Sequence, residues 1–182
     1  MVDRDGLSDG VVLLRPWRVD DAEWYASVAA NDELIQRFTT ESPTVTAEAV
    51  RTAIVELLAG PVGTAGFLVA DAATRERLGN VALTYDAREG DVSYWLDPSA
   101  RGRGVATRAL RMFSSWAFTA LGLSQLRLRA HIDNGPSRAV AERAGFTRDP
   151  DRDERRQIKG ETWPMVAYVL YRRNWSGGTA HT

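Results

Sequence analysis

The stretch DPSARGRGVATRAL, residues 97–110, places two glycines and three arginines where an apolar strand-like run gives way to an amphipathic helix pattern. The first N–H groups of a helix have no intrahelical partner and carry partial positive charge. Gly102 and Gly104 let the backbone close around an anion. The arginines that add charge are Arg101, Arg103 and Arg108. The joint therefore predicts a phosphate site, in particular a pyrophosphate site, with a solvated surface turn as the alternative.

Two familiar phosphate loops do not fit this joint. A Walker A loop needs a lysine followed by serine or threonine after its second glycine, and no lysine follows Gly104 here. The dinucleotide fingerprint asks for three glycines in an early strand-helix-strand unit. This joint has two glycines and lies late in the chain, so both loops are excluded.

Two spaced motifs resemble a known family. Residues 101–106, RGRGVA, match the R/Q-x-x-G-x-G/A signature of the GNAT superfamily of N-acetyltransferases. Residues 134–146, NGPSRAVAERAGF, resemble the N-x-x-S-x-x-V-A-x-x-x-G-F segment of the branch that acetylates N-terminal residues of ribosomal proteins. LLRPWRVDDAEWY, residues 13–25, resembles the opening of that branch. The similarity runs from about Val11 to Arg173.

The resemblance implies acetyl-CoA as co-substrate and no metal. It implies a sheet that opens after the SYWLD strand, so that the backbone of this strand pairs with the amides of pantetheine. The glycine-arginine joint would hold the pyrophosphate, and the thioester would point toward residues 134–137. The residues implied for acetyl-CoA binding are Trp95, Leu96, Asp97, Arg101, Gly102, Arg103, Gly104, Val105, Ala106, Asn134 and Ser137.

Transfer in this family is direct attack of an amine on the thioester carbonyl, with a backbone N–H near Leu96 expected to polarise the oxygen. The chain has no cysteine, so a thiol-bound acyl intermediate is excluded. Many members carry a tyrosine as general acid seven residues after the motif's asparagine, where this chain has Ala141. Ser137 is the expected hydrogen-bond partner of the departing sulfur, with helix capping as its alternative role.

The general base is less defined. The ribosomal branch can place a glutamate near residues 155–156, where this chain has two arginines. The candidates that remain are Glu161, Asp97 and Tyr94 acting through a water, and Trp163 is a candidate for lining the acceptor site. Exposing the neutral form at pH 7 costs about 1.4 kcal/mol for an α-amine and about 4.6 kcal/mol for a lysine. A chain without an evident strong base therefore fits an α-amine better.

Composition narrows the classes of partner. Of 182 residues, 44% are hydrophobic and 26% are charged, which is ordinary for a soluble globular protein. The net charge of −1 gives no electrostatic signature of nucleic acid or an anionic membrane as partner. No cysteine and only two histidines exclude disulfides and a typical zinc site. With no signal-peptide pattern and no membrane-spanning run, the cytoplasm is the expected compartment.

Hydrophobic periodicity predicts the elements that position the site. Helices are expected at residues 20–32, 46–59, 104–121 and 135–144, and strands at 11–17, 66–71, 79–85, 91–97, 126–132 and 164–173, with a hairpin arm before the last. Their order predicts an α/β (α+β) fold with a mixed, mostly antiparallel sheet of six to seven strands and helices on both faces. The resemblance implies the splayed GNAT fold. We expect one domain at 11–174, between a flexible leader at 1–10 and a flexible tail at 175–182.

The resulting hypothesis is an acetyl-CoA-dependent N-acetyltransferase that acts on a primary amine, in the first place the N-terminal α-amine of a protein or peptide. One alternative acceptor is a small amine such as an antibiotic, a polyamine or an amino acid. Another alternative is an acyl-CoA-binding module without turnover, because the usual tyrosine and glutamate are missing. The sequence leaves the oligomeric state open, a homodimer included.

Overall fold

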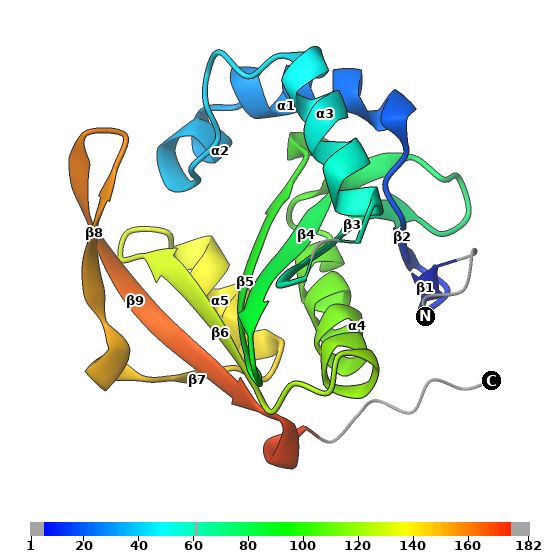
Figure 1. Cartoon of the computed structure of the whole chain (residues 1–182). Helices are drawn as coiled ribbons and strands as arrows, with labels where there is room; N and C mark the ends of the chain where they lie inside the picture. The colour runs from blue at the N-terminus through cyan, green and yellow to red at the C-terminus, as the bar shows by residue number, and fades with distance from the viewer. Residues whose placement is uncertain (1–5, 61, 176–182) are drawn as a thin grey trace.

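A mixed, mostly antiparallel sheet forms the centre of the protein, whose computed structural model describes residues 6–60 and 62–175 (Figure 1). Its strands in this part of the chain are β1 (Leu7–Ser8), β2 (Val12–Arg15), β3 (Thr64–Asp71), β4 (Arg77–Asp86), β5 (Glu89–Leu96), β6 (Gln125–His131), β7 (Thr147–Arg148), β8 (Glu154–Ile158) and β9 (Glu161–Tyr171). They lie in the order β1-β2-β3-β4-β5-β6-β9-β7, and β8 pairs with β9 as the predicted hairpin.

Helices cover both faces of the sheet, as predicted. The α-helices of the described residues are α1 (Ala22–Asn31), α2 (Glu33–Phe38), α3 (Ala47–Leu58), α4 (Val105–Ala120) and α5 (Gly135–Arg143). The helices α1, α2 and α3 lie over one face, and α4 and α5 lie over the other (Figure 1). Alternation along β3 serves both layers, because Leu68 and Ala70 pack with α1 and α3, whereas Phe67 and Val69 pack with α4.

The sheet opens between β5 and β6. These strands run parallel, and their register pairs Glu89–Val92 with Gln125–Leu128 and extends no further. β5 stays paired with β4 as far as Leu96, and β6 stays paired with β9 as far as His131. The ends of β5 and β6 therefore diverge, which confirms the splayed sheet (Figure 1).

The helix α4 begins and ends at the predicted glycines. Gly104 is its N-cap with φ 77°, and Gly122 follows its last turn with φ 70°. Both values lie in the left-handed region, which glycine adopts without steric cost. Among the described residues, no helix combines the length and the apolar character needed to cross a bilayer.

The structure differs from the sequence prediction in three places. The sheet has nine strands in the described residues rather than six or seven, partly because β1 and β7 are two-residue strands that leave no periodic pattern. The short helix α2 was not predicted. Ile132, the last residue of the strand expected at 126–132, lies just beyond β6 and is 45% exposed.

The expected leader and tail each lie partly within the described residues. β1 lies within the expected leader and pairs with β2, and residues 1–5 lie outside the described residues. Trp175, the first residue of the expected tail, has its ring 6.3 Å from that of Phe118. Residues 176–182 also lie outside the described residues.

A buried carboxylate ties the start of α1 to the sheet. The side chain of Asp21 is fully buried and accepts hydrogen bonds from Arg15 Nη1 and Nη2 and from Arg77 Nε, each at 2.7 Å. The Arg18 N–H donates to the same carboxylate at 2.9 Å. Burial by itself raises the pKa of Asp21, but these donors outweigh it and the pKa lies below its usual value.

Candidate active site

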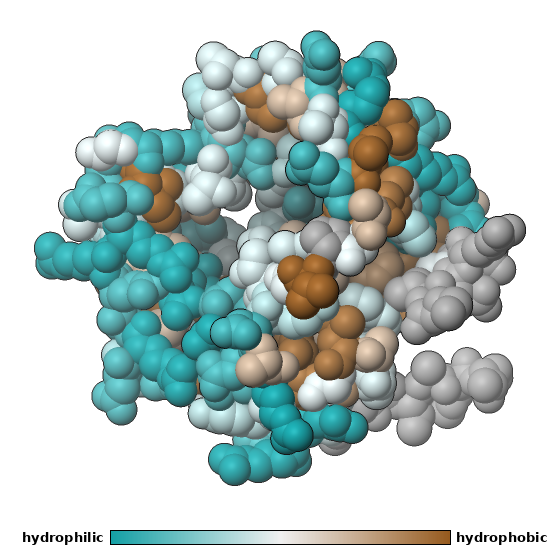
Figure 2. Space-filling model, in the orientation of Figure 1, coloured by the Kyte–Doolittle hydropathy of each residue, from teal (hydrophilic) through white to brown (hydrophobic). Residues whose placement is uncertain are grey.

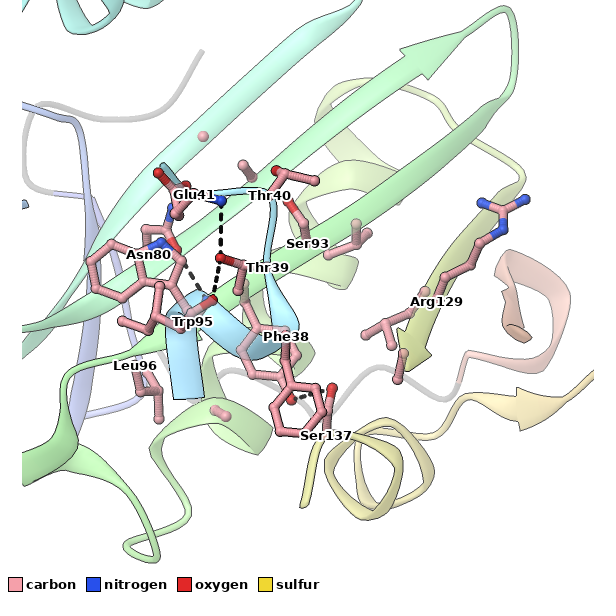
Figure 3. Close-up of a pocket in the computed structure, with 18 of the residues that line it drawn as sticks. Phe38, Thr39, Thr40, Glu41, Asn80, Ser93, Trp95, Leu96, Arg129 and Ser137 are labelled. Carbon is pink, nitrogen blue, oxygen red and sulfur yellow. Dashed lines mark hydrogen bonds between the residues drawn. The ribbon is translucent and has the colours of Figure 1, made fainter. Parts of the chain in front are cut away.

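A cavity of about 1330 Å³ occupies the opening of the sheet. This volume is large enough for a small-molecule ligand. β3, β4, β5, β6, α5 and the first turn of α4 line one part. α1, α2, α3, the loop after α2 and the β8–β9 hairpin line most of the rest. Figure 2 shows the surface hollowed between the helices α1–α3 and the strands below them. Figure 3 shows how Glu41, Asn80, Trp95 and Ser137 come together from these separate elements.

The glycine-arginine joint of residues 101–106, which we call the cradle, borders this cavity at the start of α4. Gly102 and Gly104 have φ of 72° and 77°, and a Cβ at either would meet nothing within 4 Å, so the space beside them is open. The first bond of the helix runs from the Arg108 N–H to the Gly104 C=O at 3.2 Å. The N–H groups of the preceding three residues, Val105, Ala106 and Thr107, are therefore the orphan donors of this helix end.

Thr107 adds a second polar group to the same place. Its Oγ1 is buried and has no hydrogen-bond partner among the described residues, and the residue lines the cavity. A buried hydroxyl without a partner is costly, and an anion at the helix terminus would satisfy it. The first turn of α4 thus fits a phosphate-bearing ligand.

The arginines of the joint are directed mainly at protein partners. Arg101 binds Asp32 through two nitrogens, at 2.7 and 3.1 Å, and donates to the Leu96 C=O at 2.8 Å. Arg108 pairs with Asp9 at 2.8 Å, and Arg103 is exposed and does not line the cavity. The cradle therefore offers chiefly backbone donors. Arg143 of α5 also lines the cavity, and its positive charge opposes the rise in the pKa of Tyr94 that burial causes.

At the end of β5, one of the three backbone N–H groups of Trp95, Leu96 and Asp97 faces the opening. The Trp95 N–H donates to Asn80 Oδ1 at 3.1 Å, and the Asp97 N–H donates to the Leu78 C=O at 2.9 Å. Because N–H directions alternate along a strand, the Leu96 N–H points toward the open side. The Asp97 carboxylate accepts from the Ser99 N–H at 2.9 Å, caps the turn and does not line the cavity.

Tyr94 and Ser137 meet across the opening. The Tyr94 hydroxyl donates to Ser137 Oγ at 3.2 Å, and both residues line the cavity. Asn134 is the N-cap of α5, because its Oδ1 accepts the Ser137 N–H at 3.1 Å. Burial raises the pKa of Tyr94, although Ser137 and Arg143 act against it, so this phenol stays protonated at neutral pH and can donate a proton.

Glu161 is not brought to the cavity. It is the first residue of β9 at the turn of the β8–β9 hairpin, is exposed, and is not among the lining residues. Trp163, two residues on, does line the cavity and is 6% exposed. Among the described residues, no cluster of three or more histidine, aspartate or glutamate side chains could hold a metal ion.

Sequence reasoning missed a different carboxylate. Glu41, in the loop after α2, lines the cavity, and its Oε1 accepts the Tyr25 hydroxyl at 2.5 Å. Glu41 lies in a polar, aperiodic loop, and Tyr25 lies 16 residues earlier in a helix pattern. Neither has a neighbour in sequence that marks it as part of a site.

Comparison with known families agrees with this geometry. Residues 12–147 match the family model described as "Acetyltransferase (GNAT) domain", and the chain belongs to this family.

Individual relatives give narrower descriptions. "Putative ribosomal N-acetyltransferase YdaF" of Bacillus subtilis (strain 168) is 32% identical over 90 residues, which are 50% of this chain and 49% of that protein. Mycobacterium smegmatis RimJ, solved in complex with CoA-disulfide, has a TM-score of 0.80 at 22% identity over 98% of this chain and 88% of that one. Spermidine N-acetyltransferase from Vibrio cholerae, in complex with CoA and spermine, has a TM-score of 0.78 at 19% identity over 91% and 98%. The two structures support the fold alone.

Proposed function

We propose that the protein is an acetyl-CoA-dependent N-acetyltransferase that transfers acetyl directly to the N-terminal α-amine of a protein or peptide. The observation that carries the proposal is the joining of three features in one cavity: the open first turn of α4, the free edge of β5, and the Tyr94–Ser137 pair. The names of the relatives support it, since ribosomal N-acetyltransferase and RimJ are both among them.

The chain's own residues supply what CoA binding needs. The N–H groups at the start of α4 and Thr107 Oγ1 would bind the pyrophosphate, and the open edge at Leu96 would pair with pantetheine. The CoA complexes among the structural relatives support the same ligand.

In the reaction the amine nitrogen attacks the thioester carbonyl carbon, a C–N bond forms and the C–S bond breaks. The Leu96 N–H would stabilise the carbonyl oxygen as it gains negative charge. The Tyr94 hydroxyl would give its proton to the leaving sulfur, held in place by Ser137. Two protons leave the ammonium nitrogen overall: one replaces the proton that Tyr94 gave to sulfur, and the other passes to solvent.

The charges of the cavity favour an α-amine over a polyamine. Its lining residues in the described chain carry four guanidinium groups, Arg101, Arg129, Arg143 and Arg156, and two carboxylates, Glu41 and Asp91. Arg101, Arg129 and Arg156 are paired with carboxylates. In the described chain the lining therefore leaves one unpaired acid, Glu41, together with Arg143, and a ligand with several positive charges finds no second acid there. The neutral form of an α-amine is also the cheaper one to expose, by about 3 kcal/mol relative to lysine.

A small-amine acceptor remains the second candidate, because a spermidine N-acetyltransferase shares the fold. A screen with acetyl-CoA, measuring thiol release and the mass of the products, separates the two. We expect peptides with free alanine or serine N-termini to be acetylated with a kcat/KM at least tenfold above that of spermidine or free amino acids. Turnover of the small amines alone would overturn the proposal, and CoA binding without turnover of any amine would indicate a binding module.

A further inference from the structure

We infer that Glu41, held by Tyr25, binds the ammonium group of the acceptor, and that the acceptor carries a single positive charge on an apolar body. This inference rests on the proposed function and adds the binding residue and the substrate class.

The Tyr25–Glu41 pair fixes a carboxylate in the cavity. The Tyr25 hydroxyl donates to Glu41 Oε1 at 2.5 Å. Burial and the negative charge of Glu41 raise the pKa of Tyr25 far above its usual value, so the phenol remains a donor at every working pH. Among the described residues, the side chain of Glu41 has no other hydrogen bond or ion pair. Its second oxygen is therefore available to a ligand.

The pair is anchored on the strand that borders the opening. The ring of Tyr25 packs edge-on against Trp95 of β5, with centroids 4.9 Å apart, and against Trp17, with centroids 5.6 Å apart. The Glu41 N–H donates to Thr39 Oγ1 at 3.2 Å, and Thr39 ends α2. In Figure 3, Glu41 lies beside Asn80 and Trp95, on the helix side of the cavity. The carboxylate thus stands over β5, where the proposed reaction takes place.

Glu41 differs from the other carboxylate of the cavity. Asp91 accepts from Arg127 Nη2 at 2.8 Å and also pairs with Arg129, so its charge is already neutralised. Burial lowers the pKa of Lys159 and the charge of Glu41 opposes this effect, but the Lys159 Nζ donates to the Gln36 C=O at 2.6 Å. Of the cavity-lining residues in the described chain, Glu41 is the one acid left for an incoming cation. One such acid matches one ammonium group.

Apolar and aromatic side chains form part of the cavity lining. The ring centroid of His131 lies 5.7 Å from that of Phe38 and 5.6 Å from that of Trp163. Phe38, Trp163 and the neighbouring Met165 line the cavity, and Met165 is 9% exposed. A lining of this kind favours an apolar side chain next to the amine, and it offers no second anion for a further amine.

Glu41 can also take part in the proton balance. Its carboxylate would receive the first proton of the ammonium group and release it to solvent, which leaves the neutral amine that attacks the thioester. The second proton follows the path through Tyr94 to sulfur, so the products are the amide, the thiol and one free proton.

The test has two measurements. Calorimetry records the titration of CoA-loaded protein with a pentapeptide that begins with alanine, and steady-state kinetics with acetyl-CoA give the KM for the same peptide. We expect Glu41→Gln to raise the peptide Kd and KM at least tenfold, and Tyr25→Phe to raise them at least threefold, with the Kd for CoA unchanged. The N-acetylated peptide should bind wild-type protein at least tenfold more weakly than the free peptide. Spermidine should also bind at least tenfold more weakly than the free peptide.

The matched control is Glu56→Gln, which removes an exposed carboxylate of α3 outside the cavity and should leave the peptide Kd unchanged. Thermal melting checks that each variant is folded. Glu41→Gln protein that binds the free peptide within twofold of wild type overturns the inference while wild-type turnover keeps the proposed function. Wild-type protein that binds CoA and the peptide but acetylates no amine overturns the proposed function instead.

Discussion

The hydroxyl of Tyr94 donates to Oγ of Ser137 at 3.2 Å, across the gap where β5 and β6 separate. The phenol comes from a strand and the serine from the first turn of a helix. Ala141, at the position where many family members carry a tyrosine, is fully buried and leaves no phenol on α5. Under the proposed function, the strand would supply from the opposite side of the opening the proton donor that the helix lacks.

Substitution of this pair should slow chemistry without weakening CoA binding. We expect Tyr94→Phe to lower kcat at least a hundredfold, because general acid catalysis typically contributes about 10²–10⁴-fold. Ser137→Ala should lower kcat about tenfold, because it removes one hydrogen bond that orients the phenol. Steady-state kinetics and CoA calorimetry measure both effects, and the Kd for CoA should stay within twofold.

A double variant tests whether the two groups act as a unit. If Tyr94 donates through the geometry that Ser137 fixes, Tyr94→Phe/Ser137→Ala should be no slower than Tyr94→Phe alone. Tyr85→Phe, on the neighbouring strand β4, is the control for loss of a phenol at a partly buried site. Equal kcat for Ser137→Ala and wild type would leave this serine with helix capping alone.

The glycine cradle should be sensitive to a side chain at one end of α4 and not at the other. Gly104 and Gly122 have nearly the same φ, 77° and 70°, and a Cβ at either has open space within 4 Å. Valine at each should cost about 1–2 kcal/mol of stability, from the left-handed backbone. Only Gly104→Val should weaken CoA binding, at least tenfold, since it fills the cradle. Calorimetry with CoA measures this, and equal losses at both sites would contradict a phosphate site at residue 104.

Local signals made the two glycine positions and the helix after them predictable. The two glycines, the periodic run after them and the end of the preceding strand lie within one short segment, and backbone preferences act at that range. The opening of the sheet followed from the family resemblance. What the sequence could not show is where each arginine points. Arg101 binds Asp32, 69 residues away, because the fold brings the turn before α2 beside the joint.

The two glutamates illustrate the same limit. Both Glu41 and Glu161 lie in polar stretches, and only Glu161 had a neighbour, Trp163, that suggested a site. The structure directs Trp163 into the cavity and leaves Glu161 exposed at the hairpin turn, although the strand period places both residues on the same face of β9. Glu41 reaches the cavity through the path of a loop, which no period encodes.

The buried Asp21 should make stability depend on acid pH. Its pKa in the folded protein is below the unfolded value of 3.8, so its contribution is complete above that pH and is lost as pH falls through the folded pKa. Asp21→Asn should lower the free energy of unfolding at pH 7 by about 3 kcal/mol, because two arginines lose their charged partner. Urea unfolding of both proteins from pH 7 to pH 2.5 should show this difference narrowing below about pH 4.

The neighbouring acid provides the control for this titration. Asp20→Asn removes an exposed carboxylate from the same turn and should change the free energy of unfolding by less than about 0.5 kcal/mol at every pH. A difference between wild type and Asp21→Asn that stays constant from pH 7 to pH 2.5 would show that the charge of Asp21 contributes nothing.

The contact between Lys159 and Gln36 joins the β8–β9 hairpin to α2, two elements that line the cavity, and should therefore affect acceptor affinity. Lys159, the chain's one lysine, lies at the turn of the β8–β9 hairpin and donates its Nζ to the C=O and to Oε1 of Gln36, at 2.6 and 3.1 Å. Lys159→Met keeps the aliphatic stem and removes the donor. We expect it to raise KM for a peptide acceptor about three- to tenfold and to leave the Kd for CoA unchanged, because α2 and the hairpin would no longer be joined. Arg155→Met, which removes an exposed cation on the same hairpin outside the cavity lining, should leave KM unchanged.

Because no other side-chain amine exists, an amine-reactive reagent reports the contact between Lys159 and Gln36 directly. Lys159 should be modified faster in Gln36→Ala than in wild type. Equal rates would mean that the hairpin does not contact α2 in solution.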